Sequence, residues 1–558
     1  MSEALGAGDR LSGGPSDDLA ATAFADELRA APYLWEGMSH ADLAHAIALH
    51  QCGAIDTTTA RALLDALLRL HAVPFSDVSL DARTGDVYNN RDALLRRLAP
   101  SVAGHLHAGR ARREATTVGW LLGCRDALLG LAVDLADALA VLAALGRAHA
   151  ETSMPDFTYL HRAHPTTLGH YLLAHAWPLA RHLDRVEAVV GRLGSNSPAG
   201  SGSVNGTRIP LDRNLLADLL GFSGVMPHTR DAMWAPDVVI DVAGVALQVS
   251  TSLDRLAEEL QLFTTEGFGF LELADEHSRA SVIMPHKKNP YALTHVRGAA
   301  RRLTGTFQGV VASMHTASGQ PDNRTIAYLD VPEMLVSASS SLRLMRSVLV
   351  HATFDTDALA RAAADPLTAS TEVCDELCLR HGLDNRSAHR VVGRAIRSAL
   401  DDGRAMFTAA ELEVAATEIG VALDGDRLDD DELAVVTDAR HVVESRTTPG
   451  GAGVGQVLMM ADYLTDFAAG ARSAALAHPA VRYARRLLEI AAGRDPDASP
   501  AAAGPAPATA DGPAPDVADP RSAADRTDEA GRDDEAGRDD EAGRDDRTHD
   551  EPDDGGAP

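Results

Sequence analysis

The chain has 558 residues, of which 45% are hydrophobic and only 4% are aromatic, and its formal net charge is −29. This negative charge would repel nucleic acids and anionic membranes, which excludes both as partners. Abundant alanine, leucine and arginine favour helix over sheet, so we predict an all-α protein. Four scattered cysteines are too few for a disulfide framework and favour a reducing, cytoplasmic location.

The first part of the chain predicts a loose leader followed by short helices. Residues 1–20 are polar and acidic, and they lack the basic and apolar regions of a signal peptide. Capped, periodic segments at 39–53 and 57–71 then predict an N-terminal helical domain over 21–105.

A charged run introduces the central part of the chain, which we predict to be a helical bundle over 106–355. This run, His-Ala-Gly-Arg-Ala-Arg-Arg-Glu at 107–114, contains Arg110 and Arg112, and a guanidinium can bind a carboxylate through a bidentate fork. The alternative to a binding role is that these charges simply lie at the solvated start of a helix. The bundle is predicted by long apolar stretches with helical periodicity at 115–150, 166–193, 235–267 and 291–316. The most apolar of these carries two aspartates at helical spacing, which favours a packed helix over a membrane span.

Two polar segments interrupt these helices. The first, at 154–170, contains Thr158, Tyr159 and His161 together with two further histidines. A lone helix histidine is more often structural than catalytic. The second is the glycine-rich run 199–207, which lacks the preceding strand and the lysine of a phosphate-binding loop, so we interpret it as the wall of a site.

The strongest chemical signal is the run Ser-Val-Ile-Met-Pro-His-Lys-Lys-Asn-Pro at 281–290, here called the signature loop. Its Lys287 and Lys288 are the only lysines among 51 lysines and arginines. Because every other basic residue is arginine, the two lysines indicate that a compact ammonium is needed here. The alternative is that lysine occurs by chance in a solvated loop. Ser281 can supply a base, and Asn289 can donate a hydrogen bond to an oxyanion.

After the bundle we predict a C-terminal helical domain over 356–492 and a disordered acidic tail over 493–558. The tail repeats Asp-Glu-Ala-Gly-Arg-Asp three times in tandem. It cannot bury enough apolar surface to offset the entropy lost on ordering. No metal-ligand cluster or nucleotide fingerprint is evident in the sequence, so we expect no cofactor.

Together these motifs resemble those of the aspartase/fumarase superfamily, in its argininosuccinate lyase-like branch. The signature loop is similar to the family's Gly-Ser-Ser-x-Met-Pro-Gln-Lys-Lys-Asn-Pro, with Ser281, Lys287 and Asn289 retained. The resemblance implies a three-domain all-α fold and a homotetramer with a core of about twenty helices. Each active site would combine segments from different subunits, namely 107–114, 154–164 and 281–290.

The same resemblance implies elimination of fumarate from an N-substituted aspartate, a small amino-dicarboxylate. Ser281 would be the base, and Lys287 with Asn289 would stabilise the enolate-like intermediate. Tyr159, which stands where the family has a histidine, could donate a proton. A serine hydroxyl is a poor base in water, so the loop would have to close over the substrate. The implied substrate contacts are Arg110, Arg112, Thr158, His161, Met284 and Asn323.

The chain departs from the family at the amine end of the substrate. Tyr159 and Thr294 replace a histidine–glutamate pair, and Asp322, Ala327 and Asp330 stand at the positions that bind the citrulline-like arm of argininosuccinate. Three hypotheses follow: a lyase for another N-substituted aspartate, an ordinary argininosuccinate lyase, or a non-enzymatic helical assembly like the crystallins of this family. The retained lysines argue against the third.

Overall fold

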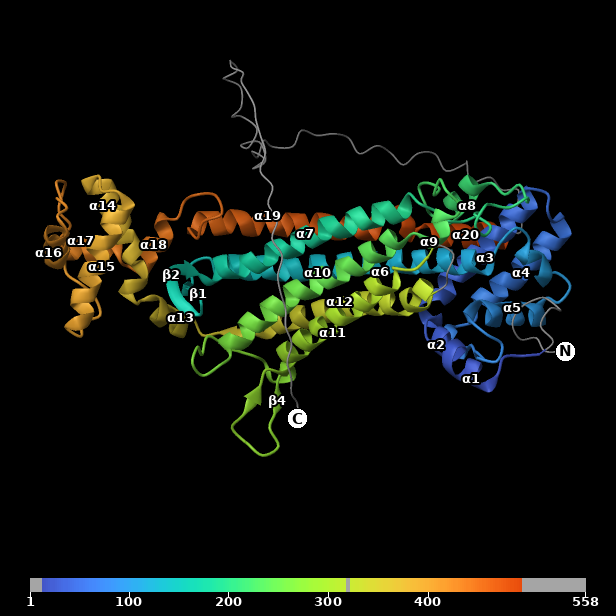
Figure 1. The fold of residues 1–558 in the computed structure, drawn as a ribbon, viewed down its shortest axis with the longest axis horizontal. Coiled ribbons are helices and arrows are strands. Elements are labelled where there is room, and N and C mark those ends of the chain that lie inside the picture. The colour runs from blue at the N-terminus through green and yellow to red at the C-terminus, as the bar shows by residue number, and fades with distance from the viewer. Residues whose placement is uncertain (1–12, 318–321, 494–558) are drawn as a thin grey trace, which may run out of the picture. The chain divides into compact units, whose positions relative to one another are not determined.

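The computed structural model describes residues 13–317 and 322–493 (Figure 1). The predicted acidic tail lies outside the described residues, apart from its first residue, and so does most of the predicted leader. The last part of that leader is helical, because the Ser16 hydroxyl caps the short helix α1 (Asp17–Leu19) at the backbone N–H of Leu19. Helical structure therefore begins before the predicted boundary at residue 20.

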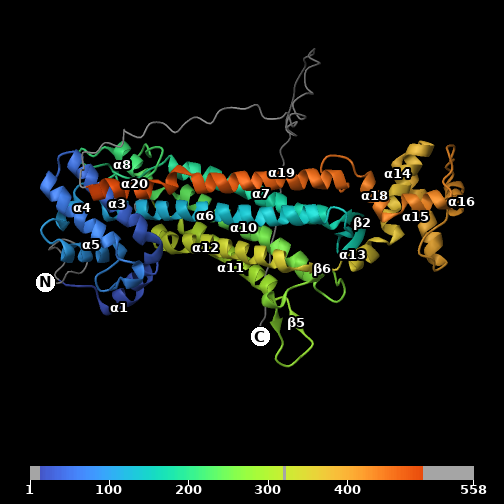
Figure 2. The same ribbon diagram turned by 180° about the vertical axis from the view of Figure 1, so that it is seen from behind.

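Long helices form the centre of the fold, and the all-α prediction is confirmed (Figures 1 and 2). In chain order they are α6 (Arg112–Ala148), α7 (Leu168–Gly194), α10 (Pro236–Phe263), α11 (Tyr291–Ser313), α12 (Asp322–His351) and α19 (Val454–Ala477). Helix α6 packs against α7, α12 and α19, while α10 packs against α7, α11 and α12. By length and composition α6 and α10 could each cross a membrane, but 56% of the most apolar window of α6 is buried inside the bundle.

The N-terminal helices pack on one end of this bundle. They are α2 (Ala25–Leu28), α3 (Ala31–Gln51), α4 (Thr57–His71) and α5 (Val87–Leu98). Helix α4 begins where the sequence predicts, because the Asp56 carboxylate accepts a hydrogen bond from the Thr59 N–H at 2.7 Å. Helix α3 begins earlier than predicted, with a proline in its first turn, where the missing N–H of proline leaves no hydrogen bond unmade. Two short helices, α8 (Arg213–Leu219) and α9 (Asp231–Trp234), lie between α7 and α10 in the chain.

The predicted C-terminal domain over 356–492 is divided between two hydrophobic cores. Buried residues of 373–436 form a core of their own, enclosed by α14 (Ser370–His381), α15 (Asn385–Asp401), α16 (Ala409–Ile419) and α17 (Asp430–Val436). The buried residues of α13 (Thr356–Ala363), α19 and α20 (Tyr483–Gly493) instead join the main core. Helix α18 (Ala439–Ser445) connects the two parts in the chain. Because α19 has 24 residues, it can follow α6 and bury its apolar face there, so this part of the predicted C-terminal domain packs with the central bundle.

Short strands complete the fold as antiparallel pairs. Strand β1 (Ser153–Thr158) pairs with β2 (His161–Thr167), so His161 lies on a strand rather than on a helix. Tyr159 and Leu160 form the turn of this hairpin, with φ angles of 54° and 61°, as a two-residue hairpin turn requires. Further along, β3 (Leu271–Glu272) pairs with β6 (Thr353–Phe354), and β4 (Arg279–Ala280) pairs with β5 (Lys288–Asn289).

Candidate active site

The three predicted site segments lie at separate places on the bundle (Figures 1 and 2). Arg112 opens α6, and the β1–β2 hairpin follows the other end of that helix. Because an α-helix rises 1.5 Å per residue, the 37 residues of α6 separate these two segments by about 55 Å. The signature loop joins β4 to β5 and leaves the bundle at a third place. One chain therefore does not bring the three segments together.

The hairpin segment presents its predicted site residues to the outside. Thr158 and His161 face each other across the last pair of the β1–β2 ladder, and both are exposed. The Tyr159 side chain in the turn is 97% exposed. A phenol and an imidazole on a projecting turn can act on a substrate only if another surface covers them.

The signature loop is also exposed, and a few hydrogen bonds shape it. The Ser281 hydroxyl oxygen accepts a hydrogen bond from the Met284 N–H at 3.1 Å, and the Asn289 side chain donates to the Arg279 carbonyl at 2.8 Å. The Met284 side chain is 37% exposed. The Asn289 side chain thus fastens β5 to β4. To act on a substrate, it would have to break this hydrogen bond or donate its second N–H to the substrate.

The two lysines of the loop differ in their surroundings. Lys288 Nζ lies 3.0 Å from a Glu272 carboxylate oxygen and 2.8 Å from an Asp275 carboxylate oxygen. These two hydrogen-bonded carboxylates, Asp275 before Glu272, raise the pKa of Lys288. Lys287 is exposed, and within the described part of the chain it has no ion pair. The structure thus ties Lys288 to the scaffold and leaves the Lys287 ammonium available to a ligand.

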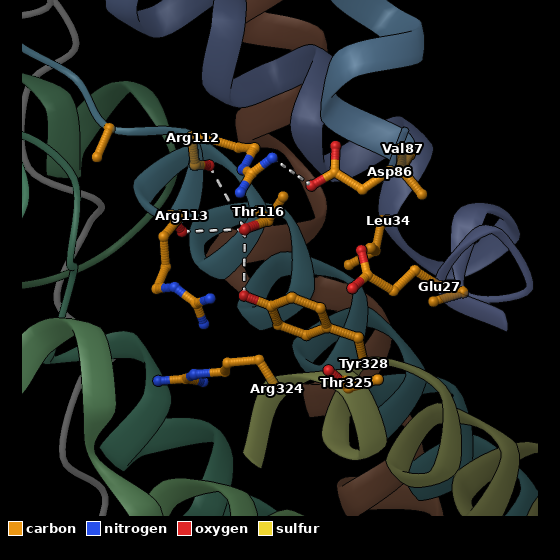
Figure 3. A pocket seen from close by; sticks show the side chains of 12 residues that line it. Glu27, Leu34, Asp86, Val87, Arg112, Arg113, Thr116, Arg324, Thr325 and Tyr328 are labelled. Atoms are coloured by element: carbon orange, nitrogen blue, oxygen red, sulfur yellow. Dashed lines mark hydrogen bonds and ion pairs between the residues drawn. The ribbon is translucent and has the colours of Figure 1, made fainter. Parts of the chain in front are cut away.

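A cavity of about 370 Å³ lies beside the first turn of α6 (Figure 3). Arg112 borders it, with Nη1 3.3 Å from an Asp86 carboxylate oxygen, and so do the Thr116 and Tyr328 hydroxyls, which lie 3.1 Å apart. The other lining residues are Glu27, Ala30, Leu34, Val87, Ala111, Arg113, Arg324 and Thr325. Of the predicted substrate contacts, Arg112 alone lines this cavity.

Two arginines that we did not predict face the same side of this cavity (Figure 3). Arg113 Nη1 and Arg324 Nε are both buried, and neither has a hydrogen-bond partner among the described residues. Burial lowers the pKa of Arg324, and the charge of Arg113 lowers it further. Glu27 and Asp86 lie on the opposite side, and burial followed by repulsion from Asp86 raises the pKa of Glu27. A guanidinium N–H group that lacks a partner can donate to an anion.

Helical spacing is the signal that could have identified these residues. Positions 112, 113 and 116 on α6 and positions 324, 325 and 328 on α12 share one face of each helix, and the contact between the two helices brings the faces together. Of the predicted arm-binding positions, Ala327 is fully buried, and its carbonyl accepts a hydrogen bond from Trp120 Nε1 at 3.0 Å. Asn323 lines a neighbouring cavity of about 300 Å³ instead.

Arg110, predicted to contact substrate, faces the interior instead. Its side chain is 2% exposed, and its Nη2 lies 2.7 Å from one carboxylate oxygen of Asp42, whose other oxygen lies 3.0 Å from Arg91 Nη2. The guanidinium pair holds the pKa of Asp42 below its usual value despite complete burial. Arg110 therefore fastens the 107–114 segment to α3, and its predicted role is corrected.

Removing the central carboxylate of this triad should destabilise the protein strongly. Asp42→Ala leaves two buried guanidinium groups unpaired, and we expect a loss of about 3–5 kcal/mol in the free energy of unfolding. Denaturant unfolding measures this loss. The matched control is Asp26→Ala, which removes an exposed ion pair with Arg29 and should change stability by less than about 1 kcal/mol. Equal effects of the two substitutions would contradict the assigned role.

The glycine-rich run is fastened to the first turn of α6, and its predicted role as a site wall stays a prediction. One Glu114 carboxylate oxygen accepts a hydrogen bond from the Gly200 N–H at 2.7 Å, and the other accepts one from the Gly202 N–H at 2.6 Å. Burial raises the pKa of Glu114 to about 7. This buried carboxyl group fixes the turn that follows α7 beside the 107–114 segment.

Comparison with protein families and curated proteins gives concordant matches. A family model described as Lyase matches residues 14–305. Argininosuccinate lyase from Methanoculleus marisnigri is 35% identical over 418 residues, which cover 74% of this chain and 82% of that protein. Argininosuccinate lyase 1 from Mesorhizobium japonicum is 31% identical over 420 residues, which cover 74% of this chain and 88% of that protein.

Solved structures of lyases and related enzymes also match this chain. An EDDS lyase variant with bound fumarate matches with a TM-score of 0.73 at 25% identity, covering 87% of this chain and 97% of that one. The 3-carboxy-cis,cis-muconate lactonizing enzyme from Pseudomonas putida matches with a TM-score of 0.62 at 20% identity, and this likeness concerns the fold alone.

Proposed function

The chain belongs to the aspartase/fumarase superfamily, in its argininosuccinate lyase-like branch, and we propose that it releases fumarate from an N-substituted aspartate whose amine portion is acidic. That it is a fumarate-releasing carbon–nitrogen lyase follows from its relatives. The acidic amine portion rests on the cavity at the start of α6. Arg113 and Arg324 border that cavity with buried N–H groups that lack partners.

Charge favours this substrate class over argininosuccinate, because three arginines, Arg112, Arg113 and Arg324, border the cavity against two carboxylates, Glu27 and Asp86. The arm of argininosuccinate is arginine, whose guanidinium and ammonium groups outweigh its one carboxylate, and Arg113 and Arg324 would repel this net positive charge in a partly desolvated cavity. A carboxylate or phosphate at that place would instead supply the missing acceptors. The match to an EDDS lyase, rather than only to argininosuccinate lyases, supports a different amine portion. An ordinary argininosuccinate lyase is the second candidate, which the curated relatives favour.

For the reaction we propose that the Ser281 oxygen takes the proton from the carbon beside a substrate carboxylate. Lys287 and Asn289 would stabilise the negative charge that develops on that carboxylate. The carbon–nitrogen bond then breaks, fumarate forms, and the leaving amine takes a proton from Tyr159. The proposed substrate contacts are Arg112, Thr158, His161 and Met284, of which Arg112 and Thr158 would place the carboxylates, and the reaction needs no cofactor.

These groups would meet in a homotetramer in the cytoplasm. The exposed hairpin turn, the exposed signature loop and the length of α6 all support a site shared between subunits. Sedimentation should therefore give an active tetramer, and an active monomer would exclude the shared site.

A substrate panel tests the acidic amine portion. Fumarate release should be fastest from N-substituted aspartates whose amine portion carries a net negative charge, and slow from argininosuccinate, whose amine portion is arginine and carries a net positive charge. Arg324→Met should raise KM for the best acidic substrate by about 10–100-fold, since hydrogen bonds to charged groups contribute about 1.5–3 kcal/mol. The exposed Arg440→Met is the matched control and should leave KM unchanged. Preference of the unaltered protein for argininosuccinate would favour the second candidate.

A further inference from the structure

A group of metal-ligating side chains lies beside the base of the signature loop. The pairing of β3 with β6 brings the turn at Asp275–His277 next to the end of α12. There Glu276, His277 and His351 each offer one ligand atom, and these three atoms lie within 4.8 Å of one another. None of the three residues belongs to the proposed elimination machinery.

The hydrogen bonding of His277 leaves one ring nitrogen ready to bind a cation. The side chain is buried, at 7% exposure, and Nε2 lies 2.9 Å from the Ser347 hydroxyl oxygen. When Nε2 carries the proton and donates to that oxygen, Nδ1 presents a lone pair. Nδ1 has no hydrogen-bond partner within the described residues, and a Glu276 carboxylate oxygen lies 3.9 Å from it. A lone pair that faces a carboxylate is unfavourable unless a cation lies between them.

His351 supplies the third ligand from the last turn of α12. Its Nδ1 lies 3.4 Å from the same Glu276 oxygen, and it donates a hydrogen bond to the Ser347 carbonyl at 3.0 Å, which metal binding would replace. In a tetrahedral zinc site with bonds of about 2.1 Å, neighbouring ligand atoms lie about 3.4 Å apart. The two spacings around the Glu276 oxygen, 3.4 and 3.9 Å, are close to this value.

We propose that Glu276, His277 and His351 bind one divalent transition-metal ion, with Zn²⁺ as the best match to two imidazoles and a carboxylate. The Ser347 hydroxyl orients the buried imidazole, and water completes the coordination. Asp275, in the same turn, pairs with Lys288 at the base of the signature loop. The ion thus ties that turn to the end of α12 and restrains the base of the loop.

Titration of the metal-free, full-length protein with ZnCl₂, followed by calorimetry, tests the site. We expect one Zn²⁺ per chain, and we expect Co²⁺ to give the absorption bands of a tetrahedral complex. Glu276→Gln and His351→Ala should each weaken Zn²⁺ binding at least tenfold. Both side chains are exposed, so the fold should persist, which circular dichroism checks.

The matched control is His389→Ala, which removes an exposed histidine from α15 and should leave Zn²⁺ binding unchanged. The proposal is overturned if the unaltered protein binds no Zn²⁺, or if the Glu276 and His351 variants bind it as tightly as the control does. Because the readout is metal binding, failure here leaves the proposed lyase reaction untouched.

Discussion

Lys287→Arg should lower the turnover of fumarate release by about 10²-fold or more, whereas Lys288→Arg should retain most of it. The Lys288 ammonium is held by Glu272 and Asp275 on the surface, and a guanidinium can keep both ion pairs at small energetic cost. The Lys287 ammonium has no ion pair in the described residues. If it must approach a developing oxyanion closely, the wider planar fork of arginine cannot replace it.

The two variants are compared in one assay with the best substrate of the panel. Ser281→Ala belongs in the same series and should leave substrate binding measurable while lowering turnover by about 10²-fold or more, as loss of a general base does. Equal tolerance of arginine at positions 287 and 288 would mean that lysine is present here for a reason other than the reaction, and the proposed mechanism would be withdrawn.

Two inactive variants should restore activity to each other when they assemble together. Arg112→Ala and Ser281→Ala damage segments that a single chain does not bring together. If each site takes Arg112 from one subunit and Ser281 from another, random assembly of equal amounts leaves about a quarter of the sites intact. Co-expression with two affinity tags, followed by tandem purification, isolates the mixed assemblies for assay.

The control for this experiment pairs Arg112→Ala with the double variant Arg112→Ala, Ser281→Ala. No site in that mixture has an intact Arg112, so no activity should return. Absence of activity in the first mixture as well, despite mixed tetramers, would show that each site is built from one chain.

Helical periodicity was enough to predict the fold class, but it could not predict which helices pack together. Helix α4 starts at its predicted cap, because Asp56 needs only the N–H of Thr59. The periodicity of α19 gives no sign that it joins α6 rather than the other C-terminal helices. The hairpin turn at Tyr159 and Leu160 was missed because neither residue is one of the glycines or asparagines that usually mark such turns.

The sequence also could not predict which side chains of the candidate site meet a ligand. Arg110 stands in the family motif and was therefore predicted to bind substrate, yet its partner Asp42 lies 68 residues earlier in the chain. Arg113 and Arg324 border one cavity only because α6 and α12 pack side by side. A motif indicates which residue types are present, whereas burial and long-range pairing decide whether a guanidinium meets a ligand or a structural carboxylate.

The position of both lysines on one exposed loop has a practical consequence. Apart from the α-amino group, the chain has no other primary amine, so an acylating dye would label only that group and the signature loop. Ion pairs with Asp275 and Glu272 raise the pKa of Lys288 and hold its ammonium, so Lys287, which has no ion pair in the described residues, should react first. The signature loop thus offers a natural attachment point for a fluorescent reporter, without any engineered residue.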